Sequence, residues 1–339
     1  WLVEMHLVMA HIAQHKDIDD PRVVQEFARM VGTPTRLDYL YLLTVADMRG
    51  TNPGLWNSWK ASLLDHLHTR TNEALARGLD QPQQQDEVIT QRQAEARIQL
   101  LKQGRDNEQL NLLWMTLSTD YFLQNSVDAI VWHTGLLWPP GQQIDSMRVE
   151  LRYDATHRCT DIFVYGPDRD DLFAHSTALL DQLSLNVLSA RIQSTAQGLS
   201  INSYLVLEED GSQVEGRERL EGIKHFLQDG LNIAEPPQGA LRMPRQLKSF
   251  QVNSEVSFEQ DENRMFTLLH LKTSDRPGLL SKVGQAFAGN KLRLHNARIA
   301  TAGAEAQDTF AITDREDQPI TDSDRLAAIA ASIKGVLDD

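Results

Sequence analysis

The chain has 339 residues, of which 41% are hydrophobic and 24% are charged, an ordinary composition for a globular protein. Its formal net charge is −14 at pH 7, which repels phosphate backbones, so we expect a protein or small-molecule partner and no nucleic acid. The single cysteine, Cys159, excludes an internal disulfide and favours a cytoplasmic location. No apolar run is long enough to cross a bilayer, so we expect no membrane partner.

Apolar residues recur at helical spacing from Trp1 to about Gly78. The first ten residues already read as the middle of a helix without a cap, so we expect further sequence to precede them. Asp20 followed by Pro21 predicts a helix start. An acidic N-cap accepts a hydrogen bond from a free main-chain amide, and proline at the first helical position has no amide hydrogen to satisfy. We therefore predict a partial all-helical domain over residues 1–80.

The segment 81–148 is predicted to be a helical connector. It opens with a polar, glutamine-rich stretch, continues with helical spacing, and ends at the breaker Trp138-Pro139-Pro140-Gly141. From Val149 onward the apolar residues alternate every second position, which predicts strands.

The second half contains an internal repeat. Asp168-Arg169 recurs as Asp275-Arg276, and Ala190-Arg191-Ile192 recurs as Ala297-Arg298-Ile299, at the same separation. We predict two ferredoxin-like βαββαβ units, copy one over 149–235 and copy two over 264–339, with a linker at 236–263. The predicted elements are 161–165, 172–183, 186–194, 201–207 and 217–227 in copy one, and 266–272, 277–287, 292–300, 309–313 and 322–333 in copy two.

The turn from Ser274 to Leu279 leads into the first helix of copy two. Pro277 favours a helix start and Gly278 allows a ligand to approach the backbone, so free amides of the first helical turn are suited to a carboxylate. The alternative is an ordinary strand-to-helix turn with good capping, which a bare motif would favour. The surrounding repeat shifts the balance toward a site for a free amino acid.

This pattern resembles the ACT domain family, small modules that bind amino acids where two copies meet. The resemblance covers about 159–231 and 266–337, and it implies a ligand near the first strand–helix turn and the second strand of a neighbouring copy. In copy two, the implied ligand-binding residues are Asp275, Arg276, Pro277, Gly278, Leu279 and Asn296. Copy one has Asp168 and Arg169 at the same place, and they are further candidate ligand-binding residues, but this copy lacks the proline–glycine pair and carries extra acids. Copy two is therefore the better candidate, and copy one is expected mainly to pair with it.

The helical half contains a second group of candidate residues. Asp47 follows the apolar run Val45-Ala46, where a carboxylate is costly unless it is paired or binds a metal. The simple alternative is a salt bridge with Arg36 or Arg49. A lone histidine such as His6 is, on spacing alone, more often structural than a metal ligand.

A longer match is more specific. The stretches 1–7, 40–47 and 50–64 closely resemble the uridylyl-removing domain of the bifunctional uridylyltransferase/uridylyl-removing enzymes, and the resemblance continues through Trp132-His133-Thr134 into both repeats. That domain belongs to the HD metal-dependent phosphohydrolases, whose site uses a histidine, a His-Asp pair and a distant aspartate. The resemblance implies Asp47 as this catalytic aspartate and metal ligand, and His6 as an accessory metal ligand. No adjacent His-Asp pair occurs in the chain, so we expect it to be catalytically incomplete alone.

The resemblance further implies the fold class and the reaction. The fold class is α plus α+β, a partial all-helical HD-type domain followed by two ACT domains. The implied enzyme joins UMP from UTP to the PII nitrogen-regulatory protein and hydrolyses that bond, with Mg²⁺ or Mn²⁺ as cofactor and glutamine as allosteric ligand.

Two alternatives remain. One is a stand-alone amino-acid-binding ACT regulatory protein without catalysis. The other is a guanosine-polyphosphate hydrolase, which fits less well because such enzymes usually carry further domains between their HD and ACT modules.

Overall fold

The computed structural model describes residues 1–16, 18–51, 56–79, 85–233, 254–261, 266–302 and 305–338. The chain divides into two compact units. The helical unit comprises Trp1–Ile144 with Ser194–Gly198, and the sheet unit comprises Asp145–Gln193 with Leu199–Asp339.

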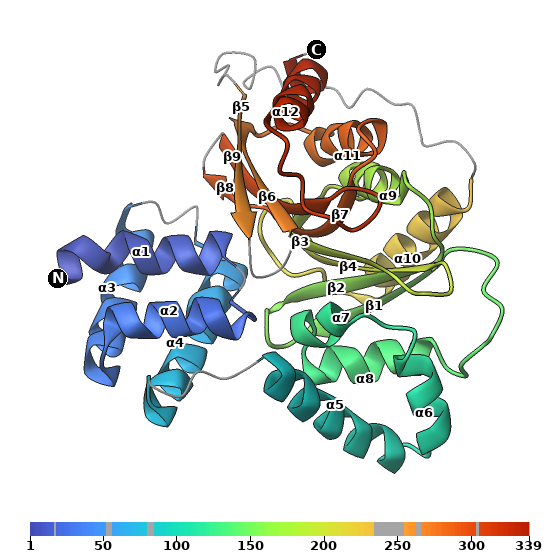
Figure 1. Cartoon of the computed structure of the whole chain (residues 1–339), viewed down its shortest axis with the longest axis horizontal. Helices are drawn as coiled ribbons and strands as arrows, with labels where there is room; N and C mark the ends of the chain where they lie inside the picture. Colours follow the sequence, from blue (N-terminus) through green and yellow to red (C-terminus); the bar gives the residue numbers. More distant parts are fainter. Residues whose placement is uncertain are drawn as a thin grey trace. The chain divides into compact units, whose positions relative to one another are not determined.

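The first part of the helical unit is a packed group of four helices. Helix α1 packs against α3 and α4, and α2 packs against α4. The predicted helix start at Pro21 is confirmed, because the Asp20 carboxylate accepts the Arg22 N–H at 3.0 Å. The bounds are α1 Leu2–His15, α2 Pro21–Val31, α3 Pro34–Thr51 and α4 Ser58–Arg77 (Figure 1).

The predicted connector forms four further helices, α5 Gln85–Lys102, α6 Asn107–Trp114, α7 Thr119–Gln124 and α8 Val127–Leu136. The buried Arg92 of α5 donates through Nη1 to the carbonyls of Phe122 and Asn125, both at 3.2 Å, so a cation satisfies acceptors at the end of α7. Thr134 accepts from Trp114 Nε1 at 3.0 Å, and His133 Nδ1 lies 3.0 Å from the Tyr121 hydroxyl. The Trp132-His133-Thr134 motif therefore has a structural role in this helical group.

The sheet unit contains the two predicted α+β copies, so the fold class is confirmed. Copy one consists of β1 Arg148–Asp154, β2 Cys159–Pro167, α9 Leu172–Gln182, β3 Leu185–Ser194, β4 Leu199–Glu208 and α10 Arg217–Leu231. Copy two consists of β5 Glu255–Asp261, β6 Phe266–Ser274, α11 Leu279–Gly289, β7 Arg293–Arg298, β8 Thr301–Ala302, β9 Glu305–Thr313 and α12 Ser323–Asp338.

The order of elements within each copy differs from the predicted βαββαβ. The fourth main strand precedes the repeat: β1 pairs antiparallel with β2, and β5 pairs antiparallel with β6. Each copy is therefore ββαββα, apart from the two-residue β8. Strand β5 also lies inside the predicted linker 236–263, whose residues 236–253 and 262–263 fall outside the described residues.

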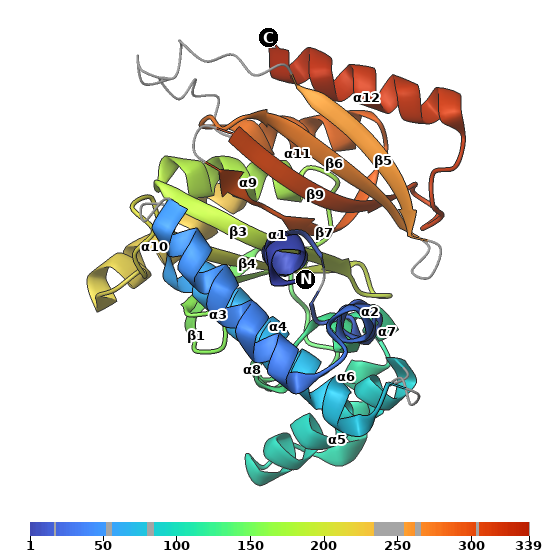
Figure 2. The same ribbon diagram turned by 90° about the vertical axis from the view of Figure 1, so that its left-hand side faces the viewer.

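The two copies share one sheet. Its strand order is β1-β2-β4-β3-β7-β9-β6-β5, with β8 beside β9. The copies join where β3 pairs antiparallel with β7, placing Ala190 opposite Ala297 and Arg191 opposite Asn296. Helices α9, α10, α11 and α12 contribute to a single apolar core with the strands, so they cover one face of the sheet (Figures 1 and 2).

Helix α9 of copy one and helix α11 of copy two pack against each other at the junction of the two copies, here called the seam. Their closest approach requires a glycine, since a Cβ on Gly284 would lie 2.9 Å from the Cα of Ala174 and 2.9 Å from Cδ1 of Phe173. Sheet pairing and helix packing thus hold the copies together from both layers.

Candidate functional site

The turn between β6 and α11 has the geometry of a helix start. Gly278 is the N-cap with φ 80°, a left-handed conformation that glycine adopts without steric cost. The Lys282 N–H donates to the Gly278 carbonyl at 2.9 Å, and the Leu279 N–H donates to the Arg276 carbonyl at 3.2 Å. These contacts leave the Gly278 amide without a main-chain acceptor at the N-terminus of α11, here called the mouth of α11, as the sequence motif predicts.

A carboxylate from the neighbouring copy lies at this mouth. The Gly278 N–H donates to Oδ2 of Asp181, near the end of α9 in copy one. Burial raises the pKa of Asp181, the Gly278 hydrogen bond opposes that rise, and nearby Asp275 adds to it. The mouth of α11 is thus suited to a carboxylate, and sequence reasoning missed Asp181 because nothing links a residue of α9 to a turn so distant in the chain.

The other predicted ligand residues are distributed less compactly. The Nε of Arg276 is buried without a hydrogen-bond partner among the described residues. Asn296 lies on β7 opposite Arg191 of copy one, and its neighbour Ala297 belongs to the core beneath the helices. Successive strand residues point to opposite faces, so Asn296 faces away from the helices, and its role as a ligand residue stays a prediction.

The equivalent turn of copy one forms the same kind of main-chain helix start, with no side-chain cap at its N-cap Asp171. Arg169 lies 2.8 Å from His175 Nδ1 through Nη2 and 3.3 Å from the Asp171 carboxylate through Nε. Burial, followed by the charge of Arg169, lowers the pKa of His175. Asp170 pairs with Arg315 of copy two, while Asp168 is exposed. The acids around this turn disfavour a ligand carboxylate.

A second difference between the copies lies in the sheet. Asp308 of β9 is opposite Leu271, and Asn202 of β4 is opposite Val164. Directly opposite residues share a face, and Leu271 and Val164 both belong to the core, so Asp308 and Asn202 occupy equivalent core-facing positions. The backbone contacts agree: Asp308 Oδ1 accepts the Ala300 N–H at 3.3 Å, and Asn202 Oδ1 accepts the Gln193 N–H at 3.4 Å.

Asp308 is only 1% exposed, and its Oδ2 has no hydrogen-bond partner within the described ranges. Burial raises its pKa to about 8, the Ala300 amide partly opposes this, and Asp275 raises it further. Asp275, in the β6–α11 turn, thus raises the pKa of both Asp181 and Asp308. Neither Asp181 nor Asp308 was identified from the sequence.

The predicted metal ligands lie on two helices that pack together, Asp47 on α3 and His6 on α1. The Thr44 hydroxyl, one turn before Asp47, donates to the His6 carbonyl at 3.3 Å. Asp47 accepts from the Thr51 hydroxyl at 3.4 Å, and His6 Nδ1 lies 2.6 Å from the Val3 carbonyl. These positions are compatible with two ligands of one site, and their metal role stays a prediction.

Arg36 and Arg49, the alternative salt-bridge partners of Asp47, each lie over a tryptophan ring instead. Arg36 lies 5.2 Å from the Trp1 ring and Arg49 lies 5.8 Å from the Trp56 ring. No group of three or more potential metal-binding His, Cys, Asp or Glu side chains occurs in the described part of the chain. Mg²⁺ or Mn²⁺ would therefore need ligands beyond Asp47 and His6.

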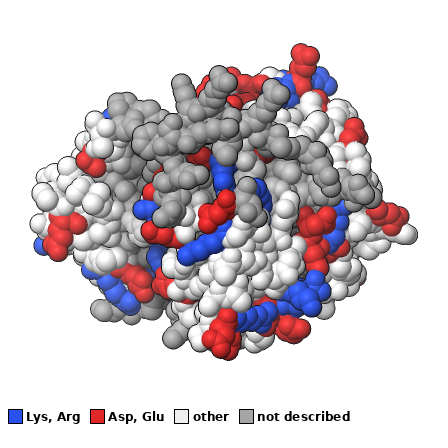
Figure 3. All heavy atoms as spheres, turned by 90° about the horizontal axis from the view of Figure 1, so that it is seen from above, with Lys and Arg blue, Asp and Glu red and all other residues white. Residues whose placement is uncertain are grey.

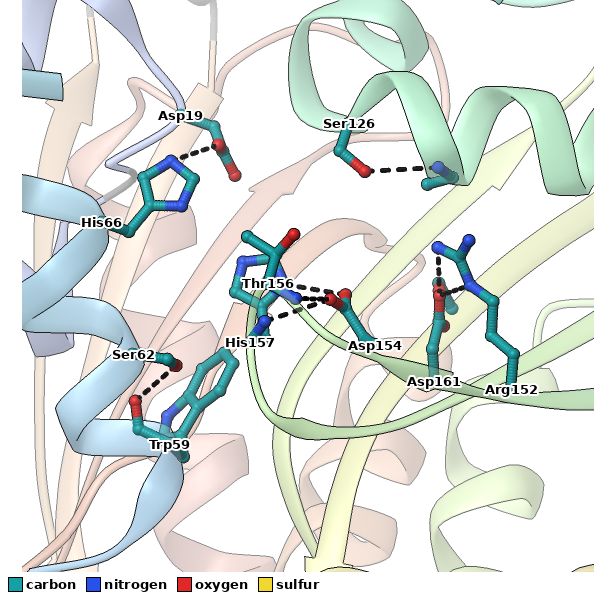
Figure 4. Close-up of polar contacts among 12 residues, drawn as sticks. Asp19, Trp59, Ser62, His66, Ser126, Arg152, Asp154, Thr156, His157 and Asp161 are labelled. Carbon is teal, nitrogen blue, oxygen red and sulfur yellow. Dashed lines mark hydrogen bonds and ion pairs between the residues drawn. The ribbon is translucent and has the colours of Figure 1, made fainter. Parts of the chain in front are cut away.

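Each unit also contains a buried polar contact outside the predicted site (Figure 4). In the helical unit, His66 Nε2 lies 3.5 Å from the Asp19 carboxylate. In the sheet unit, Arg152 Nη2 lies 3.1 Å from the buried Asp161, which also accepts from the Ser203 hydroxyl. Burial raises the pKa of Asp161, and the charge of Arg152 opposes that rise. The polar contacts of these side chains link strands β1, β2 and β4.

On the side seen in Figure 3, acidic and basic side chains are interspersed, without a continuous basic area among the residues drawn in colour. Among the described residues, no helix is both long and apolar enough to be a candidate membrane span.

Comparison with known proteins assigns the family. A family model described as the fifth domain of uridylyltransferase GlnD matches residues 84–136, which hold α5 to α8. The bifunctional uridylyltransferase/uridylyl-removing enzyme of Methylococcus capsulatus is 44% identical over 96% of this chain and 38% of its own length. Enzymes of the same name are 43% identical in Pseudomonas fluorescens, over 95% of this chain and 36% of the relative, and 41% identical in Ectopseudomonas mendocina, over 98% and 38%.

No solved structure matches the chain. The chain spans less than two fifths of the length of these curated relatives. Because the identity extends through both units, this chain belongs to the family of the bifunctional uridylyltransferase/uridylyl-removing enzymes.

Proposed function

We propose that the chain is the glutamine-responsive regulatory part, together with the end of the uridylyl-removing domain, of an enzyme that attaches UMP from UTP to the PII signal protein and removes it. The observation that carries the regulatory role is the seam between the copies, where the α11 mouth of copy two meets the Asp181 carboxylate of copy one. A ligand carboxylate can replace Asp181 there, since both suit the same amide at a helix N-terminus. The two copies act as a pair of ACT domains.

Regulation follows from this location. Glutamine can shift the balance between uridylylation and its reversal only if it binds one state of the enzyme more tightly than the other. A ligand that takes the Gly278 amide from Asp181 breaks a contact between the copies, and it therefore favours a different pairing at the seam. This links occupancy of the site to the arrangement of the copies.

The helical unit contributes two groups to the proposed hydrolysis of the phosphodiester. Asp47 and His6 would supply ligands for Mg²⁺ or Mn²⁺, together with ligands from outside the described residues. The cation, when bound, neutralises phosphate charge and activates water. The packing of α1 on α3 holds the two side chains on adjacent helices.

Calorimetric titration with L-glutamine tests the regulatory proposal. Wild type is expected to bind, and Gly278→Val is expected to lose binding, because a β-branched residue is strained at φ 80° and covers the amide. Asp275→Ala tests the neighbouring acid, with a changed affinity expected. Asp168→Ala in copy one is the matched control and is expected to bind as wild type does. Unchanged binding in both copy-two variants would remove the site from this turn.

An activity assay tests the division of labour. The purified chain is expected neither to attach UMP to PII nor to remove it, since two metal ligands are too few for the site. Asp47→Ala in the full-length enzyme is expected to abolish removal while transfer is retained. Appreciable removal of UMP by the isolated chain would contradict this assignment.

A further inference from the structure

The two copies carry different residues at the same buried, core-facing position of the sheet. Asp308 in copy two and Asn202 in copy one both face the core, and each accepts one main-chain N–H from the end of the preceding strand segment. Their side chains have nearly the same shape, so the difference between them is one of charge and donor capacity.

Each of these side chains retains one unsatisfied atom. Asp308 Oδ2 and Asn202 Nδ2 are buried without hydrogen-bond partners among the described residues. Asn202 is 0% exposed and its Oδ1 is also held by the Ser200 hydroxyl at 3.0 Å. A buried polar atom without a partner costs free energy, so a hydrogen bond from each of these atoms to a ligand group would be stabilising. The carboxylate oxygen of Asp308 matches a cation, whereas the amide nitrogen of Asn202 matches an acceptor.

We propose that Asp308 is the residue by which copy two selects ligands that carry a positively charged amino group. It rests on the proposed function, in which the Gly278 amide holds the ligand carboxylate. The Asp308 carboxylate provides a negative charge that can pair with such an amino group. It lies on the core-facing side of β9, opposite the strand β6 that leads into the Gly278 turn. An α-amino acid presents both groups on one carbon, and a simple carboxylate does not. Copy one, with Asn202, lacks this selection.

The ionisation of Asp308 adds a second readout. With a pKa of about 8, the carboxyl group is largely protonated at pH 6.5, and it must release its proton to pair with an ammonium group. The charge of Asp275, in the β6–α11 turn, also raises the pKa of Asp308. Affinity for an amino acid is therefore expected to rise between pH 6.5 and 8 in wild type.

The experiment compares L-glutamine with glutaramate, the same molecule without its α-amino group, by calorimetric titration of the whole chain. Wild type is expected to prefer glutamine by roughly 10- to 100-fold, the value of one charge-assisted hydrogen bond. Asp308→Asn, which copies the residue of copy one, is expected to lose most of this preference and the rise with pH. Asn202→Asp is the matched control and is expected to keep both within about twofold, since it lies outside the site.

The outcomes are distinguishable. Thermal unfolding of each variant establishes that it is folded, and Asp308→Asn removes a buried acid, so it is not expected to unfold the sheet unit. Glutamine binding by wild type with an unchanged preference in Asp308→Asn would overturn this inference and leave the proposed function standing. Failure of wild type to bind glutamine at all would overturn both.

Discussion

Copy one and copy two share an order of elements and a sheet, yet they differ at the place where a ligand would sit. In copy one, Arg169 lies against His175 and Asp171, so the side chains beside the turn into α9 pair with one another. In copy two, the turn into α11 offers the Gly278 amide, which takes the Asp181 carboxylate from the other copy. One fold thus supports a turn whose side chains pair locally and a turn whose amide pairs with a carboxylate of the other copy.

The first prediction breaks the pairing on which the comparison depends. Gly284→Val places side-chain atoms against Ala174 and Phe173 of α9, where even a Cβ would lie only 2.9 Å from its nearest neighbours. Such overpacking is expected to lower the free energy of unfolding by about 3 kcal/mol. Urea denaturation followed by circular dichroism measures the loss.

A glycine in open surroundings provides the control. A Cβ on Gly335 of α12 would meet nothing within 4 Å, so Gly335→Ala is expected to stabilise the chain by about 0.5–1 kcal/mol. Equal stability of Gly284→Val and wild type would show that α9 and α11 do not pack as described.

The second prediction sharpens the comparison through pH. The pKa of Asp308 is raised in the folded state to about 8, so the folded chain binds the extra proton and its stability is lost as pH rises through this value. Between pH 6 and pH 8 the loss is expected to be about 2 kcal/mol, because the slope of about 1.4 kcal/mol per pH unit falls to about half at pH 8. Denaturation of wild type and Asp308→Asn at both pH values should show this component in wild type alone. The same pH response in the variant would assign the titration to another group.

The third prediction concerns the residue that lies at the open mouth. Asp181→Ala removes the internal carboxylate from the Gly278 amide, and a ligand carboxylate then binds without displacing it. Affinity for glutamine is expected to rise by about 3- to 10-fold, the value of one net hydrogen bond. Ala288→Asp, at the equivalent position of α11, is expected to leave affinity unchanged. Weaker binding by Asp181→Ala would instead make Asp181 part of the ligand site.

The smallest effect is expected at the surface contact between the copies. Arg315 pairs with Asp170, but the two side chains are 49% and 70% exposed. Exposed pairs contribute little because water and salt screen them, so Arg315→Ala should cost no more than about 0.5 kcal/mol. A loss of several kcal/mol in the same denaturation assay would show that this contact, rather than the core, holds the copies together.

The sequence predicted the repeat and the helix mouth because both have local signatures. The apolar alternation and the Asp275-Arg276-Pro277-Gly278 turn require no knowledge of distant residues. Strand β5 was missed although Val256 and Phe258 alternate with polar residues, because the surrounding polar sequence resembled a linker. Its signal was present in the chain.

The partners across the seam could not be read in this way. The strand patterns of β3 and β7 do not specify that Ala190 lies opposite Ala297, since any two apolar strands alternate alike. The predicted strand 309–313 leaves out Asp308, a residue type that is unfavourable in strands. The structure extends β9 back to Glu305, where the Ala300 amide partly compensates the buried acid.

The most direct measurement follows individual main-chain amides while L-glutamine is added to the isotopically labelled chain. Nuclear magnetic resonance is expected to show the Gly278 amide signal shifting in proportion to occupancy, while the amide of Asp171, its counterpart in copy one, stays in place. Glutamine binding that leaves the Gly278 signal unmoved, or that moves the Asp171 signal instead, would contradict the assignment of the ligand-binding turn to copy two.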